Sequence, residues 1–528
     1  MNSSPAKTPF LISTSLVALG IRSERSIARH ERWYILFALA VFAFFAVYHA
    51  LTVPLWFDEF FTLFISRLPS LPEMLRAMPA DGQPPLQYLL THLFLRVLGE
   101  SELSLRLPEL LAYMAVGLLT YRIVRRHGTA VQALFALGLL LGSIVGIEQA
   151  YTARPYGLLI AFTALVFACW QAAALRQHHR LLPLCGVSLG MAGAILSHHF
   201  GVVYIGVLLA TGETARLIQR RRLDGWMVAA IAAGLSPLVI TLPLAHQSHV
   251  ILGEAVLHAA NYGGRPKLMN FLIYLLMAAL PLLCLVAILA FLPWPRRTSA
   301  GRSSVPPPVP AHEWTAVAAL SLLLPIQMLL AALETGVLAA RYTIGTSLGL
   351  ALLCAWGLPR LARLRVIAQP LLALSTLCFL LLVAATLLLE NMHQPIWNAQ
   401  PGAEAVSPLL LNAPPELPIV VANLRDYPAE WWYSPPSIKQ RIKYLSDVPY
   451  AVKQADFLGE LSLILDQAYI PLRTSDSAAF IANHPHFLLL CTGNSLANWV
   501  PRRLAGSGWR LTPIASSGAN VLYRVDRP

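Results

Sequence analysis

The chain alternates between long apolar stretches and short polar loops. A helix needs about 20 apolar residues to cross roughly 30 Å of hydrocarbon. The first stretch, 33–53, is longer than the apolar core of a signal peptide, which has about 7–15 residues, so it predicts an uncleaved first span. Ten further stretches are similar, at approximately 105–124, 129–147, 157–175, 181–197, 200–215, 226–245, 267–292, 313–333, 341–358 and 367–389. The pattern predicts an α-helical polytopic membrane protein with about eleven transmembrane helices.

One apolar segment, 84–99, is shorter than a span and lies in a large polar loop, 54–104, that follows the first span. We expect it to form an amphipathic or re-entrant helix at the membrane interface. The alternative is that this segment crosses the membrane, which would break the regular alternation of basic and non-basic loops described next.

Basic residues gather in every second loop, as is typical of the cytoplasmic loops of membrane proteins. The opposite loops hold only isolated cations. The pattern predicts that segment 1–32 is cytoplasmic and that the C-terminus lies outside. The clusters are Arg122/Arg125/Arg126, Arg176/Arg180, Arg216/Arg220/Arg221/Arg222, Arg296/Arg297/Arg302 and Arg360/Arg363/Arg365, together with the N-terminal Lys7, Arg22, Arg25, Arg29 and Arg32.

Composition supports this interpretation. Hydrophobic residues make up 56% of the chain and charged residues 12%, whereas a soluble domain carries about 25% charged residues. This excludes an ordinary soluble enzyme, a disordered protein and a disulfide scaffold. The net charge of +13 follows from the basic loops, so no nucleic-acid partner is expected. The six cysteines include no CxxC pair, which argues against a zinc site or a disulfide framework.

The character of the chain changes after residue 389. Polar residues become more frequent, and short β-like runs occur at 418–422, 487–490 and 521–525, with helix-like spacing at 455–469. We therefore expect a transmembrane domain at 33–389 and a small soluble α/β domain at 390–528 on the outer face of the membrane.

The candidate carboxylates lie in the first outer loop. Asp58 and Glu59 are flanked by aromatic residues, and partial desolvation there would make a carboxylate more basic. The alternative is a solvated pair beside an interfacial aromatic belt. Asp81 and Gln83 precede Pro84-Pro85, a stiff step that could hold both side chains over a cavity, although a plain helix start would look the same.

The other candidate site residues are cationic or aromatic and lie in the remaining outer loops. Arg106, Arg154 and Arg341 could each hold an anionic phosphate at the membrane surface, or could extend toward lipid headgroups. Tyr156 follows Arg154 closely, and His198 could ligate a metal, carry a proton or cap a helix. Together these groups suit a reaction on an anionic lipid-linked substrate, with a carboxylate as base and arginines stabilising the leaving phosphate.

The order of these motifs resembles a known family. Asp-Glu after the first span is followed by Asp-x-Gln-Pro-Pro-Leu-x-Tyr, Arg-Leu-Pro, Ala-Arg-Pro-Tyr and Ser-His-His-Phe-Gly. This resembles integral-membrane glycosyltransferases of the GT-C fold, in particular protein mannosyltransferases and bacterial lipid A aminoarabinose transferases. The resemblance implies an inverting enzyme that moves a sugar from a polyprenyl-phosphate donor to a lipid, polysaccharide or protein acceptor. It also implies a location at the outer face of the bacterial inner membrane.

The resemblance implies roles for individual residues. Asp58 would be the base or a metal-linked carboxylate with Glu59 beside it, Arg106 and Arg154 would face the donor phosphate, and His198 would match a family histidine. The chain departs from its relatives at Gly82-Gln83, where they have His before Pro-Pro-Leu or Glu-Lys before it. Gln83 supplies neither a cation nor a carboxylate, so no cofactor is assigned and a divalent metal is left open.

A transporter or flippase of lipid-linked sugars is the alternative function. Proteins of that kind often contain internal repeats and polar groups near the middle of their spans. Here the polar groups lie at one face, and no repeat is evident.

Overall fold

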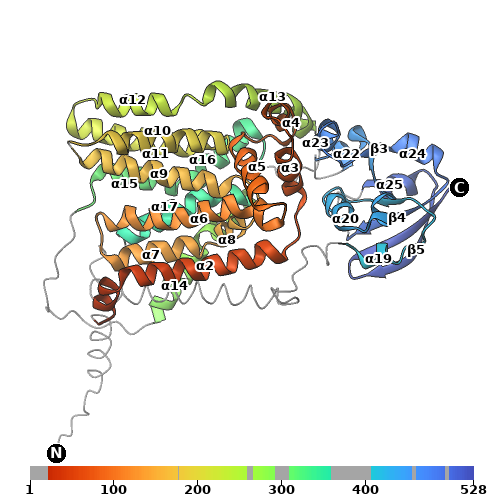
Figure 1. Ribbon diagram of the computed structural model, residues 1–528, viewed down its shortest axis with the longest axis horizontal. Coiled ribbons are helices and arrows are strands. Elements are labelled where there is room, and N and C mark those ends of the chain that lie inside the picture. Colours follow the sequence, from red (N-terminus) through yellow and green to blue (C-terminus); the bar gives the residue numbers. More distant parts are fainter. Residues whose placement is uncertain are drawn as a thin grey trace, which may run out of the picture.

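A computed structural model of the protein describes residues 22–176, 178–258, 266–291, 308–357, 406–454, 459–493 and 499–528. Long helices form a bundle, and a smaller unit that contains a β-sheet packs at one end of it (Figure 1). The predicted span at 367–389 and the basic clusters near residues 296–302 and 360–365 lie outside the described residues.

Four described helices are long and apolar enough to cross a membrane: α2 (Glu31–Thr52), α6 (Glu102–Arg125), α9 (Tyr156–Leu175) and α11 (Gly201–Arg220). Two bent pairs raise this number to six within the described residues, namely α12 (Gly225–Gly234) with α13 (Leu238–His258), and α15 (Ala311–Ser321) with α16 (Leu323–Leu330). The other predicted spans coincide with shorter helices or with helices described only in part: α7 (Ala130–Leu141) followed by α8 (Ile144–Ala150), α10 (Leu181–Ser197), α14 (Leu268–Phe291) and α17 (Ile344–Gly357). The helices therefore occur where the apolar pattern predicts them.

The two bent pairs have a shared cause. The pairs bend by 44° and 49°, respectively. Pro237 stands in the first break and Pro325 just after the second. Proline has no backbone N–H and its ring clashes with the carbonyl four residues earlier, so it breaks a regular helix.

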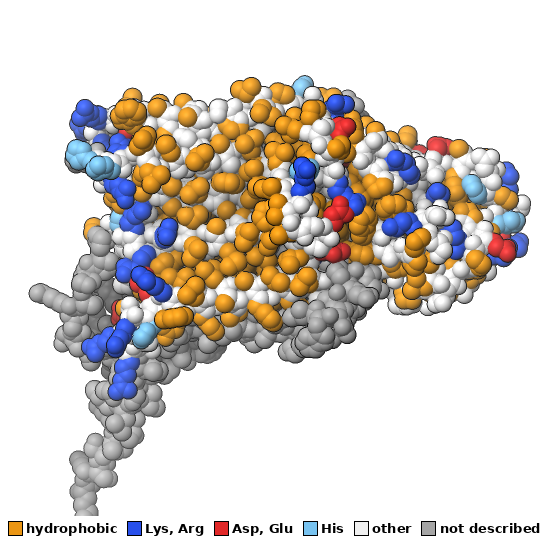
Figure 2. All heavy atoms as spheres, viewed as in Figure 1, with side chains coloured by type: hydrophobic (Ala, Val, Ile, Leu, Met, Phe, Trp, Pro, Cys, Tyr) orange, Lys and Arg blue, Asp and Glu red, His pale blue; other side chains and the backbone are white. Residues whose placement is uncertain are grey.

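The described basic loops meet at one end of the bundle. Arg125 forms an ion pair with Glu31 at 3.1 Å, Arg126 donates to Gln171 at 3.0 Å, and Arg220 donates to the carbonyl of Ala174 at 2.9 Å. In the space-filling view, Lys and Arg gather at the end opposite the C-terminal unit, and the middle of the bundle is hydrophobic (Figure 2). This is the segregation of charge that the loop pattern predicts.

The loop after the first span contains three helices, α3 (Phe57–Ser66), α4 (Leu71–Asp81) and α5 (Leu86–Leu98). The segment at 84–99 is thus mainly a helix of 13 residues, which packs against α3 and α6. Both α3 and α5 run across the direction of the long helices (Figure 1). They form a platform between the bundle and the C-terminal unit.

The C-terminal unit is built on a six-stranded sheet with strand order β3-β2-β1-β4-β6-β5. The first four strands in this order are parallel, and β6 and β5 are antiparallel additions. The three predicted strands are present as β1 (Ile419–Val421), β4 (His486–Thr492) and β6 (Asn520–Asp526). Of the helix predicted at 455–469, residues 455–458 lie outside the described residues, and the rest contains α23 (Gly459–Asp466). The other strands are β2 (Ile442–Ser446), β3 (Thr474–Asp476) and β5 (Arg510–Ser517), and the other helices are α19 (Pro408–Leu411), α20 (Tyr427–Tyr433), α21 (Pro436–Lys439), α22 (Val448–Gln454), α24 (Ser477–Asn483) and α25 (Trp499–Gly506).

Two of the three strands that were not predicted, β3 and β5, have weak sequence signals. The strand β3 has three residues, and most side chains of β5 are exposed. Neither carries the buried apolar run that marks β1 and β4. Both become recognisable as strands only through their hydrogen-bonded pairing with neighbouring strands of the sheet.

Close packing between α17 and α15 gives a first prediction. A methyl group on Gly349 would lie 2.3 Å from the backbone nitrogen of Ser321, where nothing flexible can yield. We expect Gly349→Ala to destabilise the protein by about 1–3 kcal/mol, the usual cost of overpacking, as a lower melting temperature in detergent. Gly206→Ala in α11, where a methyl group would meet no atom within 4 Å, is the control and should not lower it.

Candidate functional site

The first loop is joined to the bundle by a buried ion pair between Glu59 and Arg106. The guanidinium donates from Nε to Glu59 Oε1 at 2.8 Å and from Nη2 to Oε2 at 2.7 Å, and both side chains are 1% exposed. Arg106 also donates to the carbonyls of Ala50, Val53 and Pro54. Its five hydrogen bonds match the full donor capacity of a guanidinium.

Both carboxylate oxygens of Glu59 are likewise occupied by hydrogen bonds within the protein. Its Oε1 accepts from the backbone N–H of Ala153 at 2.7 Å, and its Oε2 accepts from that of Trp56 at 3.2 Å. This geometry does not fit the catalytic role expected for Glu59 or the phosphate-binding role expected for Arg106. In this arrangement neither side chain has a hydrogen-bonding group left for substrate, which favours a positioning role for both.

Asp58 has a different environment, although it is adjacent to Glu59. Its Oδ2 lies 3.3 Å from Nη1 of Arg341, and its side chain is 16% exposed. Arg341 also lies over the rings of Trp56 and Tyr156, at 5.5 and 5.8 Å from their centroids. Asp58 and Arg341, predicted from loops about 280 residues apart, are therefore brought together at an accessible position.

Arg154 and Asp81 form a third ion pair, next to Asp58. Arg154 Nη1 donates to Asp81 Oδ2 at 2.7 Å and to the carbonyl of Asp58 at 3.2 Å, and both paired side chains are buried. The hydroxyl of Tyr88 donates to the same oxygen of Asp81. Tyr88 was not among the residues singled out from the sequence, although the Pro-Pro-Leu-x-Tyr pattern contains it.

Aromatic rings and His198 cover another side of Arg341. The ring of His198 lies 5.1 Å from that of Tyr156 and 6.0 Å from that of Tyr342. Nδ1 of His198 accepts from the backbone N–H of Phe200 at 3.0 Å, which places the ring proton on Nε2 in the neutral form. Burial lowers the pKa of His198, so the ring is neutral at pH 7.

Several buried polar atoms here have no partner among the described residues: Nε of Arg154, Nε of Arg341, Nε2 of His198 and Oε1 of Gln83. Buried polar atoms in native proteins are nearly always hydrogen-bonded. Orphaned donors beside an accessible carboxylate are typical of a site that a substrate completes. The three donors suit anionic oxygens, and the Gln83 oxygen suits a hydroxyl.

The C-terminal unit contributes a carboxylate that the sequence did not single out. Asp466 ends α23, which packs against α4, and is 1% exposed. Burial, with a smaller contribution from Asp81, raises the pKa of Asp466 to about 8. Its Oδ2 has no partner among the described residues. No sequence signal marks this residue, because only tertiary packing brings it to Asp81.

The described residues contain no group of three or more His, Cys, Asp and Glu side chains that could hold a metal ion. His198 is surrounded by rings and arginines, and the carboxylates of Asp58 and Asp81 are each paired with an arginine. These residues do not fit a metal centre.

Part of the chain matches a known protein family, and the whole structure is similar to a solved one. Residues 82–240 match the family model described as dolichyl-phosphate-mannose-protein mannosyltransferase. The structure is similar to that of ArnT from Cupriavidus metallidurans in the apo state, with a TM-score of 0.58 and 15% identity over 93% of this chain and 97% of that chain. The same protein bound to undecaprenyl phosphate gives a TM-score of 0.56 at the same identity and coverage. No curated protein sequence is significantly similar.

The chain has the GT-C fold. Its similarity to ArnT extends over nearly the whole of both chains, so it includes the C-terminal unit as well as the helices. In this GT-C chain, the predicted residues Asp58, Asp81, Arg154, Tyr156, His198 and Arg341 lie together, and Glu59 and Arg106 lie behind them.

The buried pair gives a second prediction. Arg106→Ala leaves the Glu59 carboxylate buried without its counter-ion, and removing one partner of a buried ion pair costs about 3–5 kcal/mol. We expect this GT-C variant to show a much lower melting temperature or to be recovered only as aggregate in size-exclusion chromatography. Arg67→Ala, which breaks the exposed pair with Glu100, is the matched control and should cost less than about 1 kcal/mol. Equal melting temperatures for the two variants would contradict the positioning role.

The environment of Asp466 gives a third prediction. Its pKa is about 8 in the folded protein and about 4 in an unfolded chain, so the folded state binds the proton more tightly. The stability that comes from this proton is complete below pH 4 and is lost as the pH rises to 8. Asp466→Asn should therefore raise the melting temperature at pH 8.5 and change it little at pH 4.5. Glu416→Gln, at an exposed position in the same unit, should have no effect at either pH.

Proposed function

We propose that this protein is an inverting glycosyltransferase that moves a sugar from a polyprenyl-phosphate donor to an acceptor of the cell envelope. The Asp58–Arg341 pair carries the proposal, because it combines an accessible carboxylate with a cation that has an unused donor. The family match over residues 82–240 supports sugar transfer. The similar ArnT structure bound to undecaprenyl phosphate supports a polyprenyl-phosphate lipid as the carrier.

Asp58 is the base in this mechanism. The acceptor hydroxyl attacks the anomeric carbon while the bond from that carbon to the phosphate oxygen breaks. The hydroxyl proton passes to Asp58, and the bonding electron pair leaves with the phosphate. A base and a leaving group on opposite faces of the sugar give inversion, so Asp58 and Arg341 must separate when the donor binds.

Arg341 and Arg154 stabilise the leaving phosphate. Each has an Nε donor without a partner among the described residues, and an arginine hydrogen bond to phosphate is stronger than one between neutral groups. Donor phosphate would compete with Asp58 for Arg341. Binding of the donor would thereby release the carboxylate that acts as base, which couples substrate binding to the activation of Asp58.

The site belongs, in this proposal, on the periplasmic side of a bacterial inner membrane. The described basic loops meet at the end of the bundle opposite α3 and the C-terminal unit (Figures 1 and 2), which supports a cytoplasmic N-terminus by the positive-inside rule. Segment 1–32 would be cytoplasmic, 33–389 the membrane domain and 390–528 the periplasmic domain. The acceptor is a lipid, polysaccharide or protein of the envelope.

Asp58→Asn is the principal test. The product is first identified by mass spectrometry of envelope lipids and glycans from cells with and without the intact gene. We expect Asp58→Asn to abolish this product, because an amide cannot accept the hydroxyl proton, while the protein level in the membrane is unchanged. Full product formation by this variant would contradict the role of Asp58 as base.

Binding of undecaprenyl phosphate to the purified protein separates the two roles. Asp58→Asn should bind it at least as tightly as the wild type, because Arg341 loses its competing carboxylate. Arg341→Gln should bind it about tenfold more weakly or worse, since a charged hydrogen bond contributes about 1.5–3 kcal/mol.

A transporter, the alternative function, would move lipid-linked sugar across the membrane of proteoliposomes and leave the envelope products chemically unchanged.

A further inference from the structure

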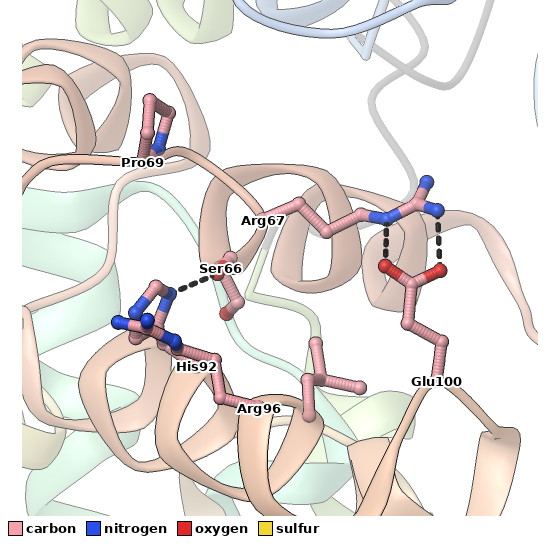
Figure 3. A pocket seen from close by; sticks show the side chains of 7 residues that line it. Ser66, Arg67, Pro69, His92, Arg96 and Glu100 are labelled. Carbon is pink, nitrogen blue, oxygen red and sulfur yellow. Dashed lines mark hydrogen bonds and ion pairs between the residues drawn. The ribbon is translucent and has the colours of Figure 1, made fainter.

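A cavity of about 420 Å³ opens at the C-terminal ends of α3 and α5, away from the Asp58 site (Figure 3). Ser66, which lines it, follows Asp58 by eight positions on α3, or about 12 Å along the helix at 1.5 Å per residue. Its lining shares no residue with the ion pairs of Asp58, Asp81 and Arg154. It is therefore a separate candidate site.

Two basic side chains from one face of α5 line this cavity. His92 and Arg96 are four residues apart, which places them on the same face of α5, and both line the cavity (Figure 3). Nδ1 of His92 donates to the carbonyl of Ser66 at 2.7 Å, which leaves Nε2 as the acceptor nitrogen of the ring, available to a ligand O–H. Arg96 is exposed and has neither a hydrogen bond nor an ion pair with any residue that the structure describes.

Further positive charge lies beside this pair. Arg67 forms an ion pair with Glu100 across the cavity, and both side chains are well exposed, so an anionic ligand can compete with Glu100 at small cost. Arg67 also lies 5.2 Å from the ring centroid of Trp432, and Lys439 of the C-terminal unit lies 5.3 Å from the same ring. Among the residues that line the cavity, the two arginines Arg67 and Arg96 outnumber the single carboxylate, Glu100.

An apolar stripe on α5 adjoins the cationic residues. Leu89, Leu93 and Val97 are spaced four residues apart and are 38%, 53% and 71% exposed. Exposed apolar side chains at this spacing form one face of the helix, which in a membrane protein contacts lipid chains. The hydrophobic surface of the bundle continues over the helices beside α5 (Figure 2).

We infer that this cavity binds the phosphate headgroup of a membrane lipid whose acyl chains lie along the Leu89–Leu93–Val97 stripe. Arg96 would hold phosphate oxygens through paired N–H groups, and His92 Nε2 would accept a hydrogen bond from the O–H of a phosphate monoester. A free phosphate ion would use the cations alone, whereas a lipid uses both the cations and the apolar stripe. The site is distinct from the donor-phosphate site proposed at Arg341.

The test is native mass spectrometry of the full-length protein, delipidated in an uncharged detergent. The probes are phosphatidic acid and, as a zwitterionic comparison, phosphatidylcholine of the same chain length. We expect one phosphatidic acid to bind in preference to phosphatidylcholine, and Arg96→Gln to reduce its affinity about tenfold, as is typical of a lost charged hydrogen bond. Arg96→Lys, which keeps the charge, should retain most of the binding.

Arg510→Gln, at an exposed position on β5, is the matched control and should bind phosphatidic acid like the wild type. Leu93→Gln should also weaken binding, since it places an amide in the path of the acyl chains. Equal binding of phosphatidylcholine, full affinity in Arg96→Gln, or competition by equimolar inorganic phosphate would each overturn the inference. Loss of undecaprenyl phosphate binding at Arg341 would not, because the two sites share no residue.

Discussion

The buried contact between Glu59 and Arg106 organises the outer end of this protein. Desolvating two charges is costly, and the pair is tolerated because every donor of the guanidinium and both carboxylate oxygens are satisfied. These hydrogen bonds join the C-terminal end of α2, the N-terminal end of α3, α6 and the turn before α9. Four separate segments are thereby held at one point.

Asp58 depends on this anchor. Consecutive residues on a helix point about 100° apart, so fixing Glu59 toward the interior turns Asp58 toward the accessible side. There it meets Arg341 from a distant part of the chain. Arg154 extends the same arrangement, because it bonds to the Asp58 carbonyl and to Asp81. One carboxylate of the Asp-Glu pair is thus buried and fully hydrogen-bonded, and its neighbour is partly exposed beside Arg341.

The C-terminal unit completes the platform. Trp432 packs against Phe60 and Phe64 of α3, and the hydroxyl of Tyr433 accepts from the backbone of Leu55 and donates to Glu102. The residues of the first loop and those of the sheet belong to one hydrophobic cluster. The placement of Asp466 beside Asp81 follows from this shared core, and it makes the site a product of both parts of the molecule.

The sequence by itself determined where helices form, because long apolar stretches have no other way to satisfy their backbone in a membrane. It also determined the segregation of basic loops, the change of character after residue 389 and the set of polar residues on one side. Which of those residues pair was decided only by the tertiary structure. A pattern of residue types does not distinguish Glu59 from Asp58, or Arg106 from Arg341, since each pair has the same chemistry and a similar sequence setting. Burial and the direction of each side chain separate them, and these depend on contacts between segments that are distant in the chain. For the same reason Asp466 and the cavity beside Arg96 carried no signal until helices from different parts of the sequence were packed together.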